Sequence, residues 1–262
     1  MGLARRDALT ANQLATISTQ ALSEVAMIDT PKKLIYRAST IALGGLFSLT
    51  CRARLFGREH LPPGGPLLLA CNHQSFLDPP LVGSMAGRPL HYMARDSLFR
   101  VPGLSALIRL HNAFPVKTDT TDLASFKTSL RILKAGGALL VFPEGTRSHD
   151  GAITQCQPGI IHLMRRANVP ILPVAVEGVF DAWPRSAILP RPAPLWIQFG
   201  RLIGPHVFEG QDPSQAASQL TQHLRQLHNQ LRMRAGRPPI GYDGDQNTAR
   251  ISWRPDNGET VI

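Results

Sequence analysis

Cysteine is scarce in this 262-residue chain, and its three cysteines show no metal-binding or disulfide pattern. They neither form a CxxC pair nor add up to an even number, which argues against a zinc cluster and a disulfide framework. An HExxH motif is missing, and His91, His111 and His149 do not have the spacing of metal ligands. A GxSxG elbow is missing too, because Gly103-Leu104-Ser105-Ala106-Leu107 lacks the second glycine. We therefore expect neither a metal hydrolase nor a serine hydrolase, and we expect reduced, cytosol-facing chemistry.

Aromatic residues make up only 6% of the chain, and acidic residues are few, at 18 against 28 lysines and arginines. The net charge of +10 favours an anionic partner. A nucleic-acid-binding module would show a basic recognition helix or an aromatic platform, and the sequence has neither, so we expect no nucleic-acid partner. The remaining anionic partners are an acidic membrane surface, a phosphorylated substrate and an acidic carrier protein.

The amino-terminal part lacks both a signal-peptide pattern and a long uncharged apolar run. The uncharged part of the apolar stretch 34–51 starts at Ser39 and covers about 13 residues, whereas a membrane-spanning helix needs about 20. Gly44-Gly45 also interrupts it. We expect a re-entrant or interfacial helix here, with a core helix of the soluble domain as the alternative. Cations that suit anionic headgroups flank the stretch: Lys32, Lys33, Arg37, Arg52, Arg54 and Arg58.

The pattern along the chain predicts three regions. Residues 1–57 form a helical membrane-association segment, with a marginal amphipathic helix near 10–27. Residues 58–235 form one α/β domain, and residues 236–262 form a flexible tail. Within the domain, short apolar runs alternate with longer segments, which predicts a mostly parallel central sheet with helices on both faces. The expected strands are 66–71, 89–94, 113–116, 138–142, 170–176 and 195–199, and the expected helices are 76–86, 96–110, 121–135 and 158–168.

A last helix is expected after Asp212, which caps it. Leucines at helical spacing give it one apolar stripe. Its basic end either faces solvent and complements the helix dipole or touches the membrane. The arginines concerned are Arg225, Arg232, Arg234 and Arg237.

The first polar cluster that follows a predicted strand is Asn72-His73-Gln74-Ser75-Phe76-Leu77-Asp78. A neutral imidazole can take a proton from an alcohol, and a carboxylate can fix its tautomer and stabilise the imidazolium. Asp78 is about 140° from His73 on an ideal helix, so the pair can meet only if His73 lies on a loop before the helix. We expect Asn72 to cap that helix and Pro79-Pro80 to limit it after Asp78. A purely structural histidine–aspartate pair is the alternative.

The second cluster is Phe142-Pro143-Glu144-Gly145-Thr146-Arg147-Ser148, which also follows a predicted strand. Its glycine lets backbone approach a ligand, and its arginine can bind a phosphate through two donors. Glu144 would repel a phosphate, so we expect it to accept hydrogen bonds from substrate hydroxyls or to hold Arg147 in place. An ordinary strand-to-loop transition is the alternative.

Together these clusters resemble two blocks of the glycerolipid acyltransferase family, which includes 1-acylglycerol-3-phosphate acyltransferases. Residues 72–78 are similar to its NHxxxxD block, and residues 142–148 to its FPEGTRS block. Residues 113–117 and 169–174 resemble the second and fourth blocks, and the order and separation agree. The similarity covers roughly residues 60–205.

The resemblance implies that His73 and Asp78 activate the hydroxyl of a lysophospholipid acceptor. It implies that the glycerol phosphate part is bound by Lys117, Glu144, Gly145, Thr146 and Arg147. Acyl groups would arrive on coenzyme A or acyl carrier protein, with no metal and no bound cofactor. A two-helix amino-terminal unit that dips into one leaflet is known in the family. It suggests a peripheral or monotopic protein that contacts membrane lipids on the cytoplasmic face of a membrane, such as a bacterial inner membrane.

Two departures from the family pattern bear on the acceptor. Lys117 stands where the second block usually ends in arginine. Lysine keeps the positive charge but cannot bind a phosphate through two parallel donors as arginine does. Gln157 stands where the family often has lysine. The expected acceptor is 1-acyl-sn-glycerol-3-phosphate, giving phosphatidic acid. The alternatives are another lysolipid, such as lyso-ornithine lipid, or a non-catalytic lipid-binding relative.

Overall fold

The computed structural model describes residues 30–117 and 122–242 and divides the chain into two compact units. The first unit ends at Ser39, so what is described of it is the beginning of helix α2 (Thr30–Cys51). The second unit begins at Thr40 and contains the remaining elements. The helix expected near residues 10–27 and the tail beyond residue 242 lie outside the described residues.

A seven-stranded sheet forms the centre of the second unit, in the order β1-β7-β6-β2-β5-β3-β4. Neighbouring strands are parallel except β6 and β7, which are antiparallel. The six strands expected from the sequence are confirmed, and β1 is an addition whose three residues form too short a run to recognise. The strands are β1 Arg54–Phe56, β2 Leu67–Cys71, β3 Leu90–Arg95, β4 Ala113–Val116, β5 Ala138–Val141, β6 Ile171–Glu177 and β7 Trp196–Phe199.

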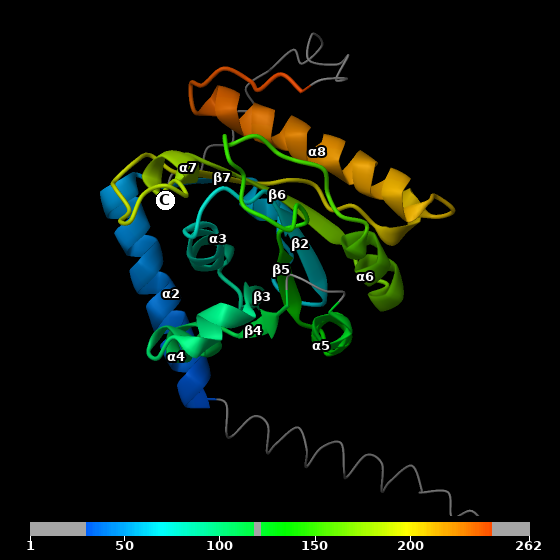
Figure 1. The fold of residues 1–262 in the computed structure, drawn as a ribbon, viewed down its shortest axis with the longest axis horizontal. Helices are drawn as coiled ribbons and strands as arrows, with labels where there is room; N and C mark the ends of the chain where they lie inside the picture. The colour runs from blue at the N-terminus through cyan, green and yellow to red at the C-terminus, as the bar shows by residue number, and fades with distance from the viewer. Residues whose placement is uncertain (1–29, 118–121, 243–262) are drawn as a thin grey trace, which may run out of the picture. The chain divides into compact units, whose positions relative to one another are not determined.

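Helices cover both faces of this sheet, so the second unit has three layers (Figure 1). Side chains alternate along β2, where Leu67 and Leu69 pack into one core cluster and Leu68 and Ala70 into the other. Helices α3, α7 and the end of α2 complete the first cluster, and α5, α6 and α8 complete the second. The expected fold class is therefore confirmed. The helices are α3 Asp78–Ala86, α4 Leu104–Leu110, α5 Leu123–Lys134, α6 Gly159–Ala167, α7 Val179–Ala182 and α8 Pro213–Arg234, with short 3₁₀ turns at Arg58–His60, Asp96–Arg100 and Pro205–Phe208.

Helix α2 corrects the length argument made from the sequence. It runs without a break through Gly44-Gly45, and its part Lys32–Cys51 is 20 residues long, which is long and apolar enough to cross a bilayer. The charges near its start do not end the helix, because lysine and arginine are good helix formers. The count of uncharged residues alone therefore understated its length.

The part of α2 in the second unit has two different apolar faces. Phe47 and Cys51 are buried in the first core cluster. By contrast, Ile41 and Leu49 are 72% and 84% exposed. The core-helix interpretation therefore accounts for one face of these turns and leaves an apolar face uncovered in the described structure.

Two arginines near the end of α8 bind a buried carboxylate. Glu177, the last residue of β6, accepts hydrogen bonds from His228 at 2.6 Å and from Arg232 and Arg237 at 2.8 Å each. Two of the four arginines considered for membrane contact thus neutralise an acid inside the protein. The sequence could not show this, because Glu177 lies 55 residues before Arg232.

Residues 236–242, which the sequence assigned to the flexible tail, are held against the domain. Asn229 exchanges two hydrogen bonds with the backbone of Ile240. The Tyr242 hydroxyl accepts a hydrogen bond from the amide of Ile153, and its ring packs on the second core cluster. The tail interpretation therefore fails for this stretch, because composition does not reveal pairing with remote partners.

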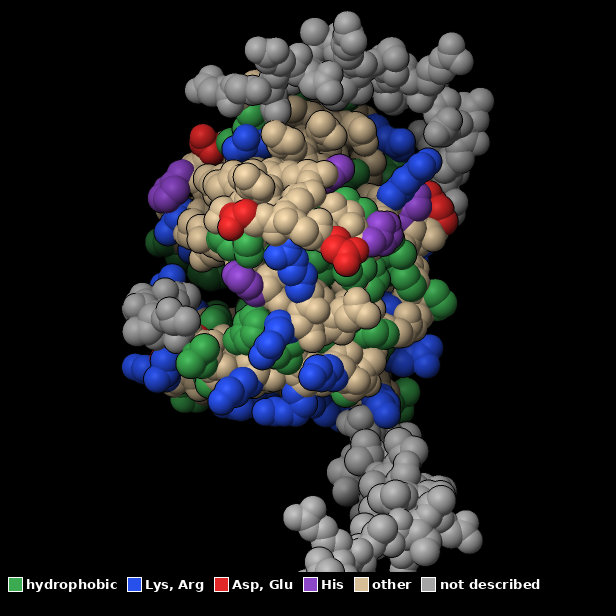
Figure 2. Space-filling view, turned by 90° about the vertical axis from the view of Figure 1, so that its right-hand side faces the viewer, with side chains coloured by type: hydrophobic (Ala, Val, Ile, Leu, Met, Phe, Trp, Pro, Cys, Tyr) green, Lys and Arg blue, Asp and Glu red, His purple; other side chains and the backbone are tan. Residues whose placement is uncertain are grey.

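Positive charge is unevenly distributed over the surface. Figure 2 shows Lys and Arg side chains gathered toward the lower edge of one face, with few acidic side chains nearby. Exposed residues on α5, which lies low in the view of Figure 1, include Lys127, Arg131 and Lys134. The distribution agrees with the anionic partners inferred from composition.

We predict that Glu177 makes the free energy of unfolding depend on pH in the acidic range. Burial alone would raise the pKa of its carboxyl, but the hydrogen bond and charge of His228 and the charges of Arg232 and Arg237 outweigh burial and lower the pKa to about 2. A carboxyl with a lowered pKa stabilises the fold above its unfolded pKa, and this stabilisation disappears as pH falls through the folded pKa. Between about pH 5 and pH 2, wild type should lose roughly 3 kcal/mol more unfolding free energy than Glu177→Gln.

Urea denaturation at a series of pH values measures this difference. Glu209→Gln, at an exposed position, is the matched control and should follow wild type. Parallel pH curves for wild type and Glu177→Gln would contradict the assignment.

Candidate active site

The residues singled out from the sequence follow three of four neighbouring parallel strands. His73 follows β2, the segment ending at Arg147 follows β5, and Lys117 follows β4. Because β2, β5, β3 and β4 are adjacent in that order and parallel, their carboxyl ends share one edge of the sheet. Arg95, the last residue of β3, falls between β5 and β4 on the same edge.

His73 and Asp78 meet as required for a histidine–carboxylate pair. His73 lies in the loop before α3, and its Nδ1 is 2.6 Å from Asp78 Oδ2. A carboxylate can only accept, so Nδ1 carries the proton and Nε2 keeps a lone pair. The His73 side chain is 19% exposed, which leaves the ring open to a substrate, whereas Asp78 is fully buried. The imidazole also stacks on Phe142, with ring centroids 4.0 Å apart.

Asp78 organises the loop as well as the imidazole. Its Oδ2 also accepts hydrogen bonds from the backbone amides of Gln74 at 2.6 Å and Ser75 at 2.8 Å. These bonds hold the loop against the start of α3. Its other oxygen, Oδ1, has no hydrogen-bond partner among the described residues.

Two expectations about the start of α3 are wrong. Asn72 does not cap the helix, because its side-chain amide pairs with the backbone N–H and C=O of Val176 in β6. Pro79 and Pro80 do not limit the helix but occupy its first turn, where a missing N–H costs nothing. Asn72 thus connects the loop to β6, and the two prolines help α3 to begin at Asp78.

The Glu144 carboxylate accepts hydrogen bonds from the backbone on two sides of the site. It is buried, and its Oε1 accepts a hydrogen bond from the His73 amide at 2.8 Å. Its Oε2 accepts from the amide and the hydroxyl of Thr154, at 2.8 and 3.0 Å. Burial raises the pKa of this carboxyl, and the bonds from Thr154 and His73 act against that rise. With both oxygens occupied, Glu144 holds backbone in place, which differs from the substrate contact and the Arg147 contact expected from the sequence.

A second hydrogen bond joins the two sequence clusters. The amide of Ser148 donates to the carbonyl of His73 at 2.7 Å. Together with the bond to Glu144, it fixes both sides of the His73 residue to the segment that follows β5. The two clusters therefore form one loop assembly.

Arg147 belongs to a group of cations at the same edge. Its guanidinium lies 3.7 Å from the centroid of the Phe76 ring, and Arg185 donates to its backbone carbonyl at 3.1 Å. The pKa of Arg147 is lowered first by burial and then by the charges of Arg185 and Arg95, while Asp78 acts in the opposite direction. Within residues 30–117 and 122–242, no carboxylate is within ion-pair distance of Arg147, Arg185 or Arg95. Such a cluster attracts an anion.

The other predicted binding residues have less defined positions. Gly145 adopts a left-handed backbone conformation with φ of +76°, and a side chain there would be strained. Thr146 beside it is exposed. Lys117 is exposed at the end of β4, three strand positions from β2 or about 14 Å by the usual spacing, so it is more distant from His73 than the Arg147 segment is.

Four features of this edge were not predicted from the sequence: Arg95, Arg185, Thr154 and the aromatic pair Phe76–Trp183. Arg95 had a usable signal, because it directly follows the predicted strand 89–94 just as the chosen residues follow theirs. Arg185 had none, since it reaches the site from the loop after α7, and Thr154 had none, since it lies outside the motif in the connection between β5 and α6. In the described part of the chain, no group of three or more His, Cys, Asp and Glu residues is arranged to hold a metal ion.

The geometry therefore places a proton acceptor, His73 Nε2, beside a cationic cluster that fits a phosphate. A protein-family model described as Acyltransferase matches residues 52–177, which include both sequence clusters. The chain is thus similar to glycerolipid acyltransferases in this matched region. The similarity agrees with the resemblance expected from the motifs.

Three of the curated relatives of this chain share one enzyme name. A 1-acyl-sn-glycerol-3-phosphate acyltransferase of Bacillus subtilis (strain 168) is 27% identical over 145 residues, which are 55% of this chain and 72% of the relative. The human alpha enzyme of that name is 32% identical over 135 residues, or 50% of this chain and 47% of the relative. A coconut (Cocos nucifera) enzyme is 28% identical over 132 residues, or 49% and 43%. The chain thus matches less than half the length of the human and coconut relatives.

Among solved structures, the crystal structure of the 1-acyl-sn-glycerophosphate (LPA) acyltransferase PlsC from Thermotoga maritima resembles this chain with a TM-score of 0.62. The two sequences are 21% identical, and the match covers 74% of this chain and 80% of that chain. This likeness shows that the fold is shared.

Proposed function

We propose that this protein is an acyltransferase that moves a fatty acyl group from an acyl thioester to the free hydroxyl of 1-acyl-sn-glycerol-3-phosphate, giving phosphatidic acid. The observation that carries the proposal is the His73–Asp78 pair at 2.6 Å, located beside the cluster of Arg147, Arg185 and Arg95. The names of the relatives support the same acceptor.

The acceptor itself serves as the nucleophile. In the described residues, no serine or cysteine side chain is hydrogen-bonded to the His73 ring, whose recorded polar partner is Asp78. Nε2 takes the proton from the acceptor hydroxyl as the oxygen attacks the thioester carbonyl. When the tetrahedral intermediate collapses, the C–S bond breaks and the imidazolium returns the proton to the departing thiolate. Buried Asp78 stabilises the imidazolium between these steps.

The acceptor phosphate binds the cationic cluster. Lys117 and Gln157 give the predicted phosphate site less fixed positive charge than the family pattern has. For that reason the sequence also allowed other lysolipids as acceptors. Arg95 and Arg185, which lie outside the motifs, add positive charge next to Arg147. A compact phosphate with up to two negative charges suits this cluster better than a zwitterionic headgroup, such as that of a lyso-ornithine lipid.

The remaining parts of the proposal concern the donor and the location. The donor is acyl-CoA or acyl carrier protein, and no metal or bound cofactor takes part. We place the protein on the cytoplasmic face of a bacterial inner membrane, attached through the amino-terminal segment 1–57, which includes α2. The region 58–235 carries the chemistry, and residues beyond it form the carboxy-terminal extension.

Replacing the proposed base tests the mechanism. His73→Ala should lower kcat for transfer from acyl thioester to lysophosphatidate by about 10²–10⁴-fold, because the hydroxyl loses its proton acceptor. Thiol release, followed with a chromogenic thiol reagent, measures the rate. His162→Ala removes an exposed histidine on α6 and should keep full activity. Wild-type turnover by a folded His73→Ala protein would refute the base assignment.

Replacing Arg147 tests phosphate recognition. Arg147→Ala should raise the acceptor KM about 10-fold to 100-fold, because a charge-assisted contact to phosphate is lost. The thioester KM should stay near wild type, and Arg166→Ala, at an exposed arginine, serves as the control. Activities on lysophosphatidate, lyso-ornithine lipid and lysophosphatidylcholine are compared in the same assay. An effect confined to the thioester, or equal use of all three acceptors by wild type, would overturn this role.

A further inference from the structure

A proline-rich loop beside the candidate site exposes two large apolar side chains at its tip. The loop follows Trp183 and covers residues 184–194, which we call the proline loop; four of its residues are proline. Ile188 is 90% exposed and Leu189 is 75% exposed. Adjacent apolar side chains this exposed are costly in water and commonly mark a contact surface.

The proline loop is held in shape at its base. The Trp183 indole N–H donates to the carbonyl of Ala187 at 3.0 Å. Arg191 donates from its amide to Ala182 O and from Nε to Asp181 O, each at 2.8 Å. Prolines on both sides of the tip restrict the backbone further. The apolar tip is therefore presented by a fixed support.

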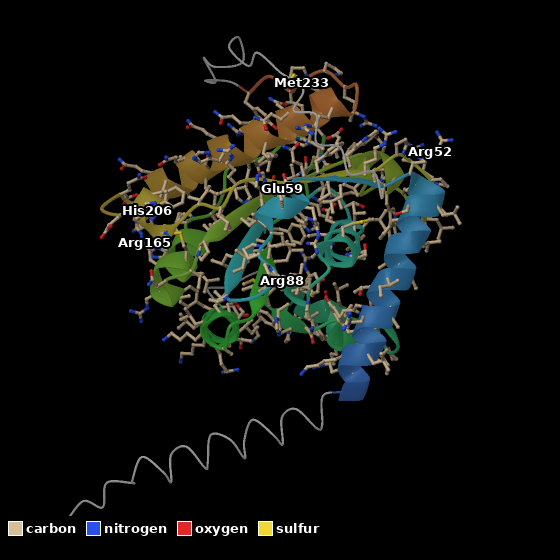
Figure 3. All side chains as sticks on the ribbon, turned by 180° about the vertical axis from the view of Figure 1, so that it is seen from behind. Arg52, Glu59, Arg88, Arg165, His206 and Met233 are labelled. Carbon is tan, nitrogen blue, oxygen red and sulfur yellow. The ribbon has the colours of Figure 1, made fainter. Side chains whose placement is uncertain are left out.

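The two ends of the loop connect the candidate site to the end of α2. Near its start, Arg185 bonds the backbone of Arg147, and the Trp183 ring lies 5.7 Å from Phe76. Just after its end, the amide of Leu195 donates to the carbonyl of Cys51 at 3.1 Å. Figures 1 and 3 both show the loop running beside this end of α2, where Figure 3 labels Arg52.

Charge around the tip selects the kind of surface that it contacts. Residues 184–194 contain no acidic side chain, whereas Arg185 and Arg191 flank the tip and are exposed. Arg52 and Arg54, at the adjoining end of α2 and in β1, are exposed as well. An apolar tip flanked by arginines matches the interface of an anionic bilayer, where acyl chains lie beneath phosphate headgroups. Trp183 at the base is also a residue type that favours this interface.

We propose that the proline loop contacts an anionic lipid surface, with Ile188 and Leu189 inserted below the headgroups and Arg185 and Arg191 at headgroup level. The contact brings the bilayer next to Arg147, so that a membrane-embedded acceptor reaches the cationic cluster without leaving the lipid. Only this second consequence rests on the proposed function.

A fluorescent probe at the tip tests the contact directly. Ile188→Cys in the full chain is labelled with an environment-sensitive fluorophore; the native cysteines are buried, which favours selective labelling. Vesicles of phosphatidylglycerol and phosphatidylcholine should shift its emission to the blue, and quenchers attached to the lipid chains should reduce it. The same label at Leu123→Cys, on an exposed residue of α5, should stay solvent-like.

The outcomes separate lipid from other occupants. An unshifted label at position 188 on vesicle-bound protein would overturn the proposal. A blue shift with a purified acidic carrier protein and none with vesicles would also overturn it, in favour of a protein partner.

Removing the apolar tip tests the consequence for catalysis. Ile188→Ser combined with Leu189→Ser should lower activity on vesicle-embedded lysophosphatidate about 10-fold or more and leave activity on a short-chain, water-soluble lysophosphatidate unchanged. The matched control replaces Leu123 and Leu202, both exposed elsewhere, by serine. Equal activity of the loop variant on both acceptors would overturn the delivery role. If wild type acylates neither acceptor, the proposed function fails, while the probe result still decides the lipid contact.

Discussion

The site depends on how the backbone of His73 is held. Its amide donates to Glu144 and its carbonyl accepts from Ser148, so two hydrogen bonds join the loop after β2 to the loop after β5. This pairing is available because β2 and β5 are neighbouring parallel strands. With the backbone fixed, Asp78 and Phe142 together leave the imidazole one orientation, with Nε2 as its free acceptor. Loss of either backbone bond would free the ring and leave a buried polar group unpaired.

Opposite charges are separated across this assembly. Asp78 and Glu144 are buried, and backbone amides satisfy most of their oxygens, so neither needs a cation. The cations Arg147, Arg185 and Arg95 consequently have no carboxylate partner within the described residues and remain available for an anion. In the proposed function, a substrate phosphate meets this positive charge, while its neighbouring hydroxyl meets a histidine that a carboxylate orients. Glu177 shows the contrast, since its arginines are consumed inside the protein.

The sequence predicted those features that local pattern controls. Apolar runs gave six of the seven strands, and the spacing of His73 and Asp78 predicted their contact once the histidine was placed on a loop. Features that depend on remote partners escaped. Glu144 was assigned to substrate hydroxyls or to Arg147 because Thr154 and the His73 amide could not be foreseen as its partners. Asn72 was assigned to the helix instead of to Val176. Helix α2 was judged too short because charges and glycines were counted as breaks, although neither interrupts a helix that packs on one face.

The central claim is that the acceptor hydroxyl attacks the thioester directly, with His73 as its base and without an acyl-enzyme. The most direct measurement is intact-protein mass spectrometry on a rapidly quenched mixture of enzyme and acyl thioester, first without and then with lysophosphatidate. The account predicts an unmodified protein mass in both samples, with phosphatidic acid formed only in the second. A protein mass increased by one acyl group, formed without acceptor and discharged when lysophosphatidate is added, would contradict it.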